Sequence, residues 1–233
     1  MKAKLIRLIE ASRQKEFEVL MPHVDDSEPD APGRWTTKDV VAHMTSWRQV
    51  AIGEVKAVLT GSEVPDVSSD DDVENERFYA QTHHLPARAI VEAAARSWDD
   101  LASAVEACTE QDLEKPRPRY PNQKLLQAVT GNSYYHVAEH IGYWYDDQGN
   151  EAEAEKAALW GYDLVTTVLP DDRTRGAAEY NLACLYAKRG RTEQALTRLA
   201  SAFELRPDLK EWSKSDTDLD AIRADPRFVK LQT

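Results

Sequence analysis

The stretch GNSYYHVAEHIGYW, residues 131–144, decides how the chain folds. Its apolar residues recur at three- and four-residue intervals, which is typical of a helix with one face in a hydrophobic core. His136 and His140 lie one helical turn apart, so their Cβ atoms are roughly 6 Å from each other on the same face. The chain has only six histidines in 233 residues. Two of them at this spacing in a core-like segment indicate a specific role.

The same periodicity extends along most of the first 148 residues. Strand-like alternation and the Asn-Gly or Asp-Gly turns of hairpins are not found in the sequence. The residues after Cys108 include three prolines between Pro116 and Pro121 and are expected to form a loop. Long amphipathic helices joined by loops predict an all-α antiparallel four-helix bundle. The expected long helices cover residues 2–21, 36–61, 86–108 and about 122–145, with a short helix over 73–81.

A third histidine lies on the inward face predicted for the second helix. The inward stripes of the second and fourth helices are Val40, His43, Trp47, Val50, Glu54 and Val58, and Leu126, Val129, Ser133, His136, Val137, His140 and Tyr143 or Trp144. Side chains on facing helices converge in a bundle, and metal sites are built in this way. Three imidazoles on one divalent ion leave positions open for water or substrate, as in catalytic sites. The alternative is that these are hydrogen-bonded core or helix-surface histidines.

A different motif overlaps the histidine pair. The residues HVAEH, 136–140, match the H-x-x-E-H pattern of inverzincin proteases, in which the glutamate activates water. That site requires a further acidic ligand downstream. Glu204 and Glu211 are the candidates, and both fall in the C-terminal tail rather than in the bundle. The bundle site is therefore preferred.

Residues 149–233 follow a different pattern. A helix is expected over 151–169, ending at Pro170. Residues 174–207 have the spacings of a tetratricopeptide (TPR) repeat, with Glu179 in place of the usual leading aromatic residue. A single repeat cannot bury its own face, so we expect it to pack on helix 151–169 and on residues 216–231. The repeat positions are Leu182, Ala183, Tyr186, Gly190, Ala195, Leu199, Ala202 and Pro207.

The composition limits the partners of this protein. A formal net charge of −12 repels phosphate backbones, so no nucleic acid partner is expected. No polybasic segment points to an anionic membrane, and no apolar run is long enough to span a bilayer. The first residues lack the pattern of a signal peptide. Cys108 and Cys184 fall in helical patterns and are expected to be buried free thiols. A cytoplasmic protein is the expectation from these features.

Three segments together resemble the DinB-like four-helix superfamily. They are WTTKDVVAHMTSWRQ (35–49), DDVENERFYAQ (71–81) and GNSYYHVAEHIGYW (131–144), and they occur in the order found in that family. The last segment looks closest to the branch that holds DfsB and the colibactin self-resistance protein. The resemblance covers about residues 1–148. It implies an up-down-down-up bundle with zinc or nickel held by His43, His136 and His140.

The resemblance also implies a class of chemistry. Some DinB-like proteins are transferases or isomerases that use bacillithiol, mycothiol or glutathione, and the self-resistance branch opens a strained ring by hydrolysis. We therefore expect a metal-dependent hydrolase or thiol transferase that acts on a small electrophilic substrate, in detoxification or self-resistance. A low-molecular-weight thiol is a candidate co-substrate.

Other side chains of these two helices are candidates for supporting roles. Glu139, Tyr143 or Asn132 could orient a ligand or relay a proton. Trp47 and Trp144 could line a pocket or simply pack in the core. The competing hypothesis is a non-catalytic helical scaffold, whose TPR-like tail binds a protein partner or forms a homodimer. Exposed apolar surface beside Tyr180 and Leu199 would favour that role.

Overall fold

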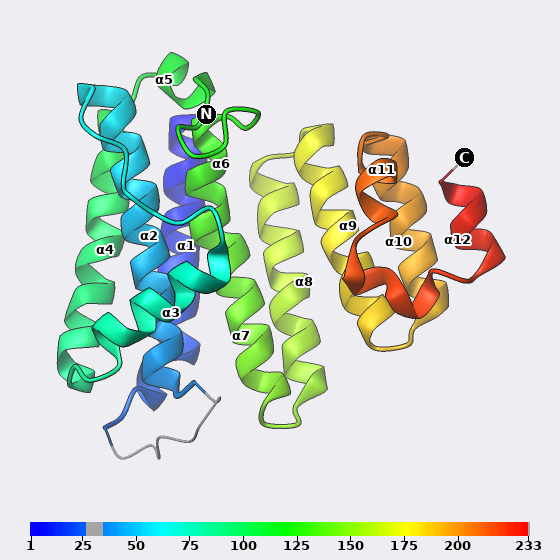
Figure 1. Cartoon of the computed structure of the whole chain (residues 1–233), viewed down its shortest axis with the longest axis horizontal. Helices are drawn as coiled ribbons and strands as arrows, with labels where there is room; N and C mark the ends of the chain where they lie inside the picture. Colours follow the sequence, from blue (N-terminus) through cyan, green and yellow to red (C-terminus); the bar gives the residue numbers. More distant parts are fainter. Residues whose placement is uncertain (27–34, 233) are drawn as a thin grey trace. The chain divides into compact units, whose positions relative to one another are not determined.

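The computed structural model describes residues 1–26 and 35–232, and within these ranges it contains helices and no strand. Pro116 and Lys124 form one isolated bridge between loop segments. The chain divides into two compact units, Met1–Ala157 and Ala158–Thr233 (Figure 1). The all-α class predicted from the sequence is confirmed.

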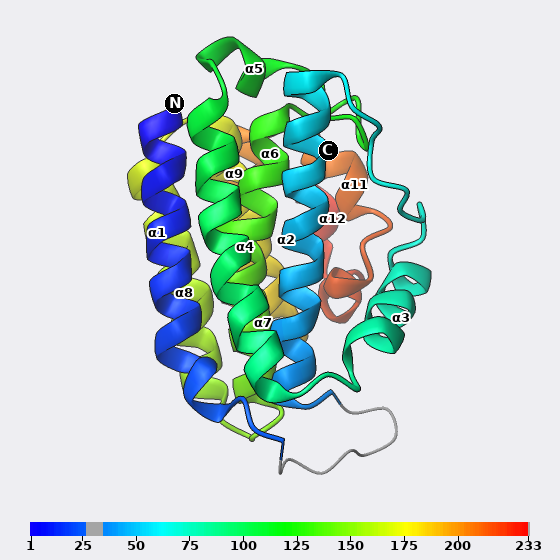
Figure 2. The same cartoon turned by 90° about the vertical axis from the view of Figure 1, so that its left-hand side faces the viewer.

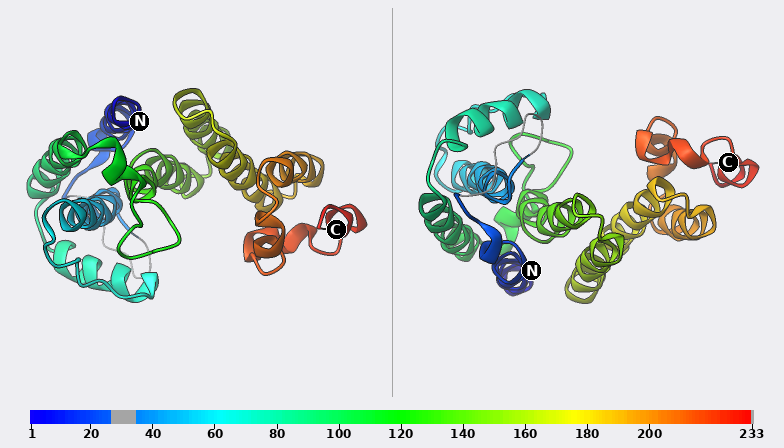
Figure 3. Two further views of the ribbon diagram at one scale, coloured as in Figure 1. Left: turned by 90° about the horizontal axis from the view of Figure 1, so that it is seen from above. Right: turned by 90° about the horizontal axis from the view of Figure 1, so that it is seen from below.

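Four helical rods make up the core of the N-terminal unit. α1 and α2 each pack against α4 and against the rod formed by α6 and α7. Figure 2 shows these rods side by side, and Figure 3 shows them nearly end-on, with α3 outside them. The order of chain directions implied by the family resemblance stays a prediction. The helices are α1 (Lys2–Val19), α2 (Thr37–Thr60), α3 (Asp71–Thr82), α4 (Ala87–Ala107), α5 (Glu110–Glu114), α6 (Leu125–Thr130) and α7 (His136–Asp146).

Local signals explain where the long helices begin and end. At the start of α2, Thr36 Oγ1 accepts the Asp39 N–H at 3.2 Å, and Asp39 Oδ2 accepts the Thr36 N–H at 3.0 Å. This reciprocal cap satisfies two amides that have no partner inside the helix. α2 ends at Gly61, whose φ of +69° suits glycine best. α1 ends at Val19, two residues before the predicted end, and a 3₁₀ turn containing Pro22 follows.

The segment expected to be a loop after Cys108 contains a short helix, so this prediction was wrong in part. α5 begins with a second reciprocal cap between Thr109 and Asp112 and buries Leu113 completely. The spacing T-x-x-D that forms the cap is visible in the sequence, but five residues are too few to show a helical period.

The register predicted for the fourth rod was wrong at its N-terminal end. Leu126 was expected to face inward, but the structure buries Leu125 and Ala128 and leaves Leu126 half-buried. A π-helical turn, Gly131–Tyr135, joins α6 to α7. Because a π turn holds an extra residue, the inward positions before it shift by about one residue relative to a continuous α-helix.

Glu54, which the sequence places on the inward stripe of α2, is buried because it has an arginine partner. Arg117 Nη2 lies 2.9 Å from Glu54 Oε2, and the Arg119 backbone N–H donates to Glu54 Oε1 at 3.0 Å. The Arg119 guanidinium lies 4.7 Å from the centre of the Trp47 ring. These contacts hold the proline-rich loop against α2.

The C-terminal unit is built around a helical hairpin. α9 (Asp172–Lys188) and α10 (Thr192–Leu205) pack closely through small residues, since Ala183, Ala195 and Ala202 are completely buried. Gly190 has a φ of +67° in the turn between them. The other elements of this unit are α11 (Leu209–Ser213), a 3₁₀ helix (Thr217–Ile222) and α12 (Pro226–Leu231). The boundary between the two units falls within α8 (Glu151–Val168), whose residues from Ala158 onward belong to the C-terminal unit.

The packing partners expected for this hairpin are confirmed. Leu219, Ile222 and Phe228 from the end segment join its core, and Leu159 and Tyr162 of α8 pack against it. A single repeat cannot bury its own apolar face, and these neighbouring segments bury it instead.

Glu179 is accommodated by polar partners rather than by aromatic packing. Its carboxylate accepts the Tyr162 hydroxyl at 2.7 Å and Arg198 Nη1 at 2.9 Å. Tyr180 and Leu199 are 5% and 0% exposed. The apolar surface that would have favoured partner binding on this side is therefore covered by the unit itself.

Two expectations about the whole chain can be compared with the structure. Cys108 and Cys184 are both buried and unpaired, as predicted. Among residues 1–26 and 35–232, no helix combines the length and the apolar character needed to cross a membrane.

Gly53→Ala is expected to destabilise the N-terminal unit by about 1–3 kcal/mol, the usual cost of overpacking. A Cβ atom at Gly53 would lie 2.3 Å from Pro65 Cγ, and a proline ring cannot swing aside. Gly142→Ala is the control, because its Cβ would meet only Ala154 O at 3.8 Å. The control is expected to gain up to about 1 kcal/mol from helix propensity. Urea unfolding measures both, and equal stabilities would show that the Pro65 contact is not tight.

Candidate metal centre

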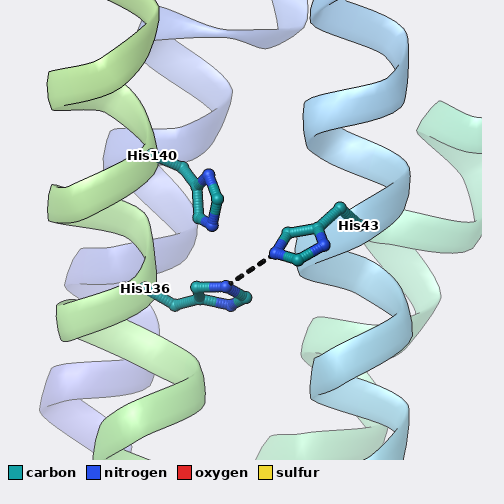
Figure 4. Close-up of side chains that lie close together, drawn as sticks. All are labelled: His43, His136 and His140. Atoms are coloured by element: carbon teal, nitrogen blue, oxygen red, sulfur yellow. Dashed lines mark hydrogen bonds between the residues drawn. The ribbon is translucent and has the colours of Figure 1, made fainter. Parts of the chain in front are cut away.

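Three histidine side chains from two helices converge in the N-terminal unit. Figure 4 shows His136 and His140 projecting from α7 towards His43 on α2. The Nε2 atoms of His43 and His136 lie 3.1 Å apart. The ring centroids are 4.5–4.9 Å from one another. One nitrogen from each ring lies within 4.8 Å of the other two. The convergence expected from the sequence is present.

The spacing of these nitrogens fits a shared divalent ion. Two nitrogens that each lie about 2.1 Å from one ion, at angles between octahedral and tetrahedral, are about 3.0–3.4 Å apart. The observed 3.1 Å falls in that interval. Imidazole donors suit both zinc and nickel. His43 is 7% exposed, and His136 and His140 are half-buried.

The three rings are in the protonation state that binds metals. Burial lowers the pKa of His43 to about 3, and the neighbouring His140 contributes in the same direction. Loss of solvation lowers the pKa of His140 to about 4. The pKa of His136 is also well below its usual value, first because of burial and then because of the charges of His140, His43 and Arg48. All three imidazoles are therefore neutral at pH 7 and can donate a lone pair.

Two of the three rings lack a hydrogen bond that most metal-binding histidines make. Within the described residues, His43 Nδ1 and His136 Nδ1 are buried and have no hydrogen-bond partner. In most metal sites this nitrogen donates to a carboxylate or carbonyl, which orients the ring and makes it more basic. Imidazoles without such partners are less basic and less firmly oriented, so they are expected to hold an ion less tightly.

An aromatic residue that the sequence analysis did not assign to the site lies against it. The Trp35 ring is 4.7 Å from the His43 ring and is nearly parallel to the Tyr79 ring at 6.4 Å. Trp35 precedes α2 and its N-cap Thr36, so it lies outside the helix. The separation of eight residues between Trp35 and His43 could not predict this contact, because helical spacing does not apply to the first residues of that interval, which are not helical.

The two tryptophans proposed as pocket walls have other contacts. Trp47 is 8% exposed, and its Nε1 donates to Asn75 Oδ1 at 2.8 Å. Trp144 Nε1 donates to Thr37 Oγ1 at 3.0 Å. Each indole N–H links two helices of the unit, which is the packing role that the sequence analysis left open for both.

The acidic candidate of α7 has two tyrosine partners. Glu139 Oε1 accepts the Tyr135 hydroxyl at 3.0 Å and the Tyr143 hydroxyl at 3.3 Å. The Tyr143 ring lies 5.8 Å from the His140 ring and is 46% exposed. Tyr135 was not among the predicted site residues, although its separation of four residues from Glu139 gives the same helix face.

The third candidate, Asn132, is used within its own helix. Its Nδ2 donates to the Ala128 carbonyl at 2.9 Å. Asn132 therefore has a structural contact next to the site.

The protease motif finds less support than the bundle site. Glu204 and Glu211 are exposed residues of the C-terminal unit, and Glu211 is paired with Lys214 at 2.5 Å. The third nitrogen donor beside the HVAEH pair is His43. The geometry thus favours three histidines over two histidines and a downstream carboxylate.

A second group of possible metal ligands lies in the C-terminal unit, formed by Cys184, Asp216 and Asp218. Its carboxylates already have structural partners. Asp216 accepts the Tyr180 hydroxyl at 2.8 Å and caps the 3₁₀ helix through the Asp218 N–H at 3.0 Å. Asp218 lies 3.4 Å from Lys188 Nζ. These contacts account for the cluster without an ion.

Comparison with models of known protein families gives a match for the N-terminal part of the chain. A family model described as the DinB superfamily matches residues 13–143, which is more than half of the chain and includes all three histidines. No curated protein matches the chain, and neither does any solved structure.

Proposed function

This chain belongs to the DinB superfamily, and we propose on that premise that its N-terminal unit is a divalent-metal-dependent enzyme for a small electrophilic molecule. The observation that carries the proposal is the convergence of three neutral imidazoles, with two Nε2 atoms 3.1 Å apart. The resemblance of residues 131–144 to the DfsB and self-resistance branch points to hydrolysis or thiol transfer as the reaction, with detoxification or self-resistance as its purpose.

His43, His136 and His140 would hold zinc or nickel. When bound by three neutral ligands, such an ion supplies Lewis acidity that activates water or a low-molecular-weight thiol for attack on an electrophilic carbon. The partial exposure of His136 and His140 leaves a way for a small substrate to approach. The absence of carboxylates among the three donors leaves the positive charge of the ion undiminished, which favours this chemistry.

Neighbouring side chains have roles that follow from their contacts. Glu139 Oε1, held by two phenol hydroxyls, is the proposed proton acceptor beside His140. Tyr143 orients this carboxylate and can return a proton from its hydroxyl. Trp35 offers an aromatic surface next to His43, against which an apolar part of the substrate can pack.

The scaffold alternative has weaker support. The TPR-like hairpin could bind a partner or a second copy of the chain, but Tyr180 and Leu199 are buried in its own core. The contacts of the hairpin with α8 and with the end segment already satisfy its apolar face. The proposed partner is therefore a small molecule rather than a protein, a nucleic acid or a membrane.

Protein purified without a histidine tag is expected to contain about one equivalent of zinc or nickel by elemental analysis. Removing the ion with a chelator should lower the thermal midpoint, because an ion at 100 times its Kd stabilises the folded state by about 2.7 kcal/mol. The reloaded protein should then consume an electrophile such as an epoxide, alone or with added thiol. Metal-free protein whose unfolding ignores both chelator and added zinc or nickel would support the scaffold.

A further inference from the structure

The turn directly before the metal ligand His136 is not an ordinary α-helical turn. Residues Gly131–Tyr135 form a π-helix, and the His136 N–H donates to the Gly131 carbonyl five residues back. π-helical turns are rare and are found frequently at functional sites. The fourth rod would be a continuous α-helix if the sequence pattern alone decided its form, so this turn requires a cause.

The π turn allows two sets of residues on the same rod to face the bundle. Leu125 and Ala128, before the turn, are completely buried, and so are Val137 and Ile141 after it. One residue more or less in a helix changes the direction of the following side chains by about 100°. At about 100° per residue, a continuous α-helix would put His136 about 20° and His140 about 60° from Leu125, but Val137 and Ile141 about 120° and 160° from it. The wider turn therefore brings Val137 and Ile141 to the buried side, and it rotates both histidines by about 100° into the direction in which they meet His43.

The side chain of Asn132 supports the π turn from within. Its Nδ2 donates to the Ala128 carbonyl at 2.9 Å, and the Gly131 N–H donates to the same oxygen. In an α-helix that carbonyl would pair with the backbone N–H of residue 132. The side-chain amide thus takes the place of the α-helical donor, at a carbonyl whose own residue has no exposure to solvent.

We propose that Asn132 is a positioning residue of the metal centre, which stabilises the π turn and thereby directs His136 and His140 towards His43. This inference rests on the proposed metal site. In this inference the orientation of His136 and His140 depends on Asn132, which is not itself one of the proposed metal ligands. With an apolar residue at 132, the Ala128 carbonyl favours the backbone N–H of that residue, and the turn shifts towards α-helical pairing.

The test compares Asn132→Ala with a matched control, Gln148→Ala. Gln148 Nε2 donates to the Trp144 carbonyl at 2.8 Å, so the control removes the same kind of bond from the far end of the same rod. Zinc affinity is measured by competition with a chromogenic chelator, and coordination by the visible spectrum of the cobalt(II) protein. Loss of a residue that orients metal ligands typically costs 10–100-fold in affinity. We expect about that loss and a changed cobalt spectrum for Asn132→Ala, and neither change for Gln148→Ala.

Two further variants make the result decisive. Asn132→Ser keeps a hydroxyl donor that can reach the carbonyl four residues back, so it should retain affinity within about threefold of the parent. Asn132→Leu keeps the size but has no donor, and it replaces Asn132→Ala if that variant does not fold. Wild-type affinity and spectrum in the variants without a donor would overturn the inference while the metal site stands. A parent protein that binds neither zinc nor cobalt would instead overturn the proposed function.

Discussion

Replacing Glu16 by leucine is expected to destabilise the N-terminal unit by about 3–5 kcal/mol. Glu16 on α1 and Arg48 on α2 form an ion pair of 2.5 Å, and their side chains are 0% and 1% exposed. Removing the carboxylate leaves a guanidinium charge in the core without its counter-charge. Because whole domains are stable by only about 5–15 kcal/mol, this loss is a large fraction of the total.

The surroundings of Arg48 show why it cannot find a replacement partner. Its Nη1 donates to Ser97 Oγ at 2.7 Å, and its guanidinium lies 3.5 Å from the centre of the Trp98 ring. Burial raises the pKa of Glu16 and lowers the pKa of Arg48, so the interior opposes each charge taken alone. Each group counteracts this effect in the other, because the charge of Arg48 lowers the pKa of Glu16 and the charge of Glu16 raises the pKa of Arg48. Together with Ser97, the pair ties α1, α2 and α4 together.

Urea unfolding of the metal-free protein measures the effect, and two controls define its cause. Glu92→Gln breaks the exposed pair with Arg88, where solvent screens the charges, and should leave the unfolding midpoint unchanged. The double variant Glu16→Leu with Arg48→Met should recover most of the lost stability, since well-packed apolar residues often replace a buried pair without cost. A single variant as stable as the parent would mean that water or another residue neutralises Arg48.

The long helices were predictable because their apolar residues repeat at the helical period. The range predicted for α2, residues 36–61, coincides with the helix and its two capping residues, Thr36 and Gly61. The range predicted for α8, residues 151–169, extends one residue beyond its observed end. The buried ion pair was not predictable in this way. A helical wheel assigns charged residues to the surface, and Glu16 and Arg48 lie 32 positions apart on different helices. Only the packed structure brings them together.

The candidate site was predictable to the same extent as the helices that carry it. The separation of four residues put His136 and His140 on one face, and the inward stripe of α2 added His43. The contacts of Trp35 and Tyr135 were missed, the first because it lies outside any helix. The π turn was missed because it depends on tertiary packing. Its extra residue allows Leu125 and Ala128 before the turn and Val137 and Ile141 after it to be buried on the same rod, and no local pattern shows that requirement.

His43→Ala is expected to lower zinc affinity by more than about 100-fold, which exceeds the loss typical of a residue that only orients a ligand. His43 is the one donor that α2 contributes, and its Nε2 lies 3.1 Å from that of His136. The remaining pair on α7 could still bind an ion weakly, as two imidazoles one turn apart do on many helix surfaces. Isothermal titration of the metal-free protein with zinc measures the difference.

A histidine outside the group serves as the control for this variant. His84 is exposed and lies outside the group, so His84→Ala should bind zinc like the parent. The thermal midpoint of His43→Ala should no longer respond to chelator, whereas that of His84→Ala should fall, because only the intact group binds the folded state tightly enough to stabilise it. Parental zinc affinity in His43→Ala would mean that α7 alone holds the ion. The approach of His43 would then be a packing contact, and the α2 side of the proposed active site would have to be abandoned.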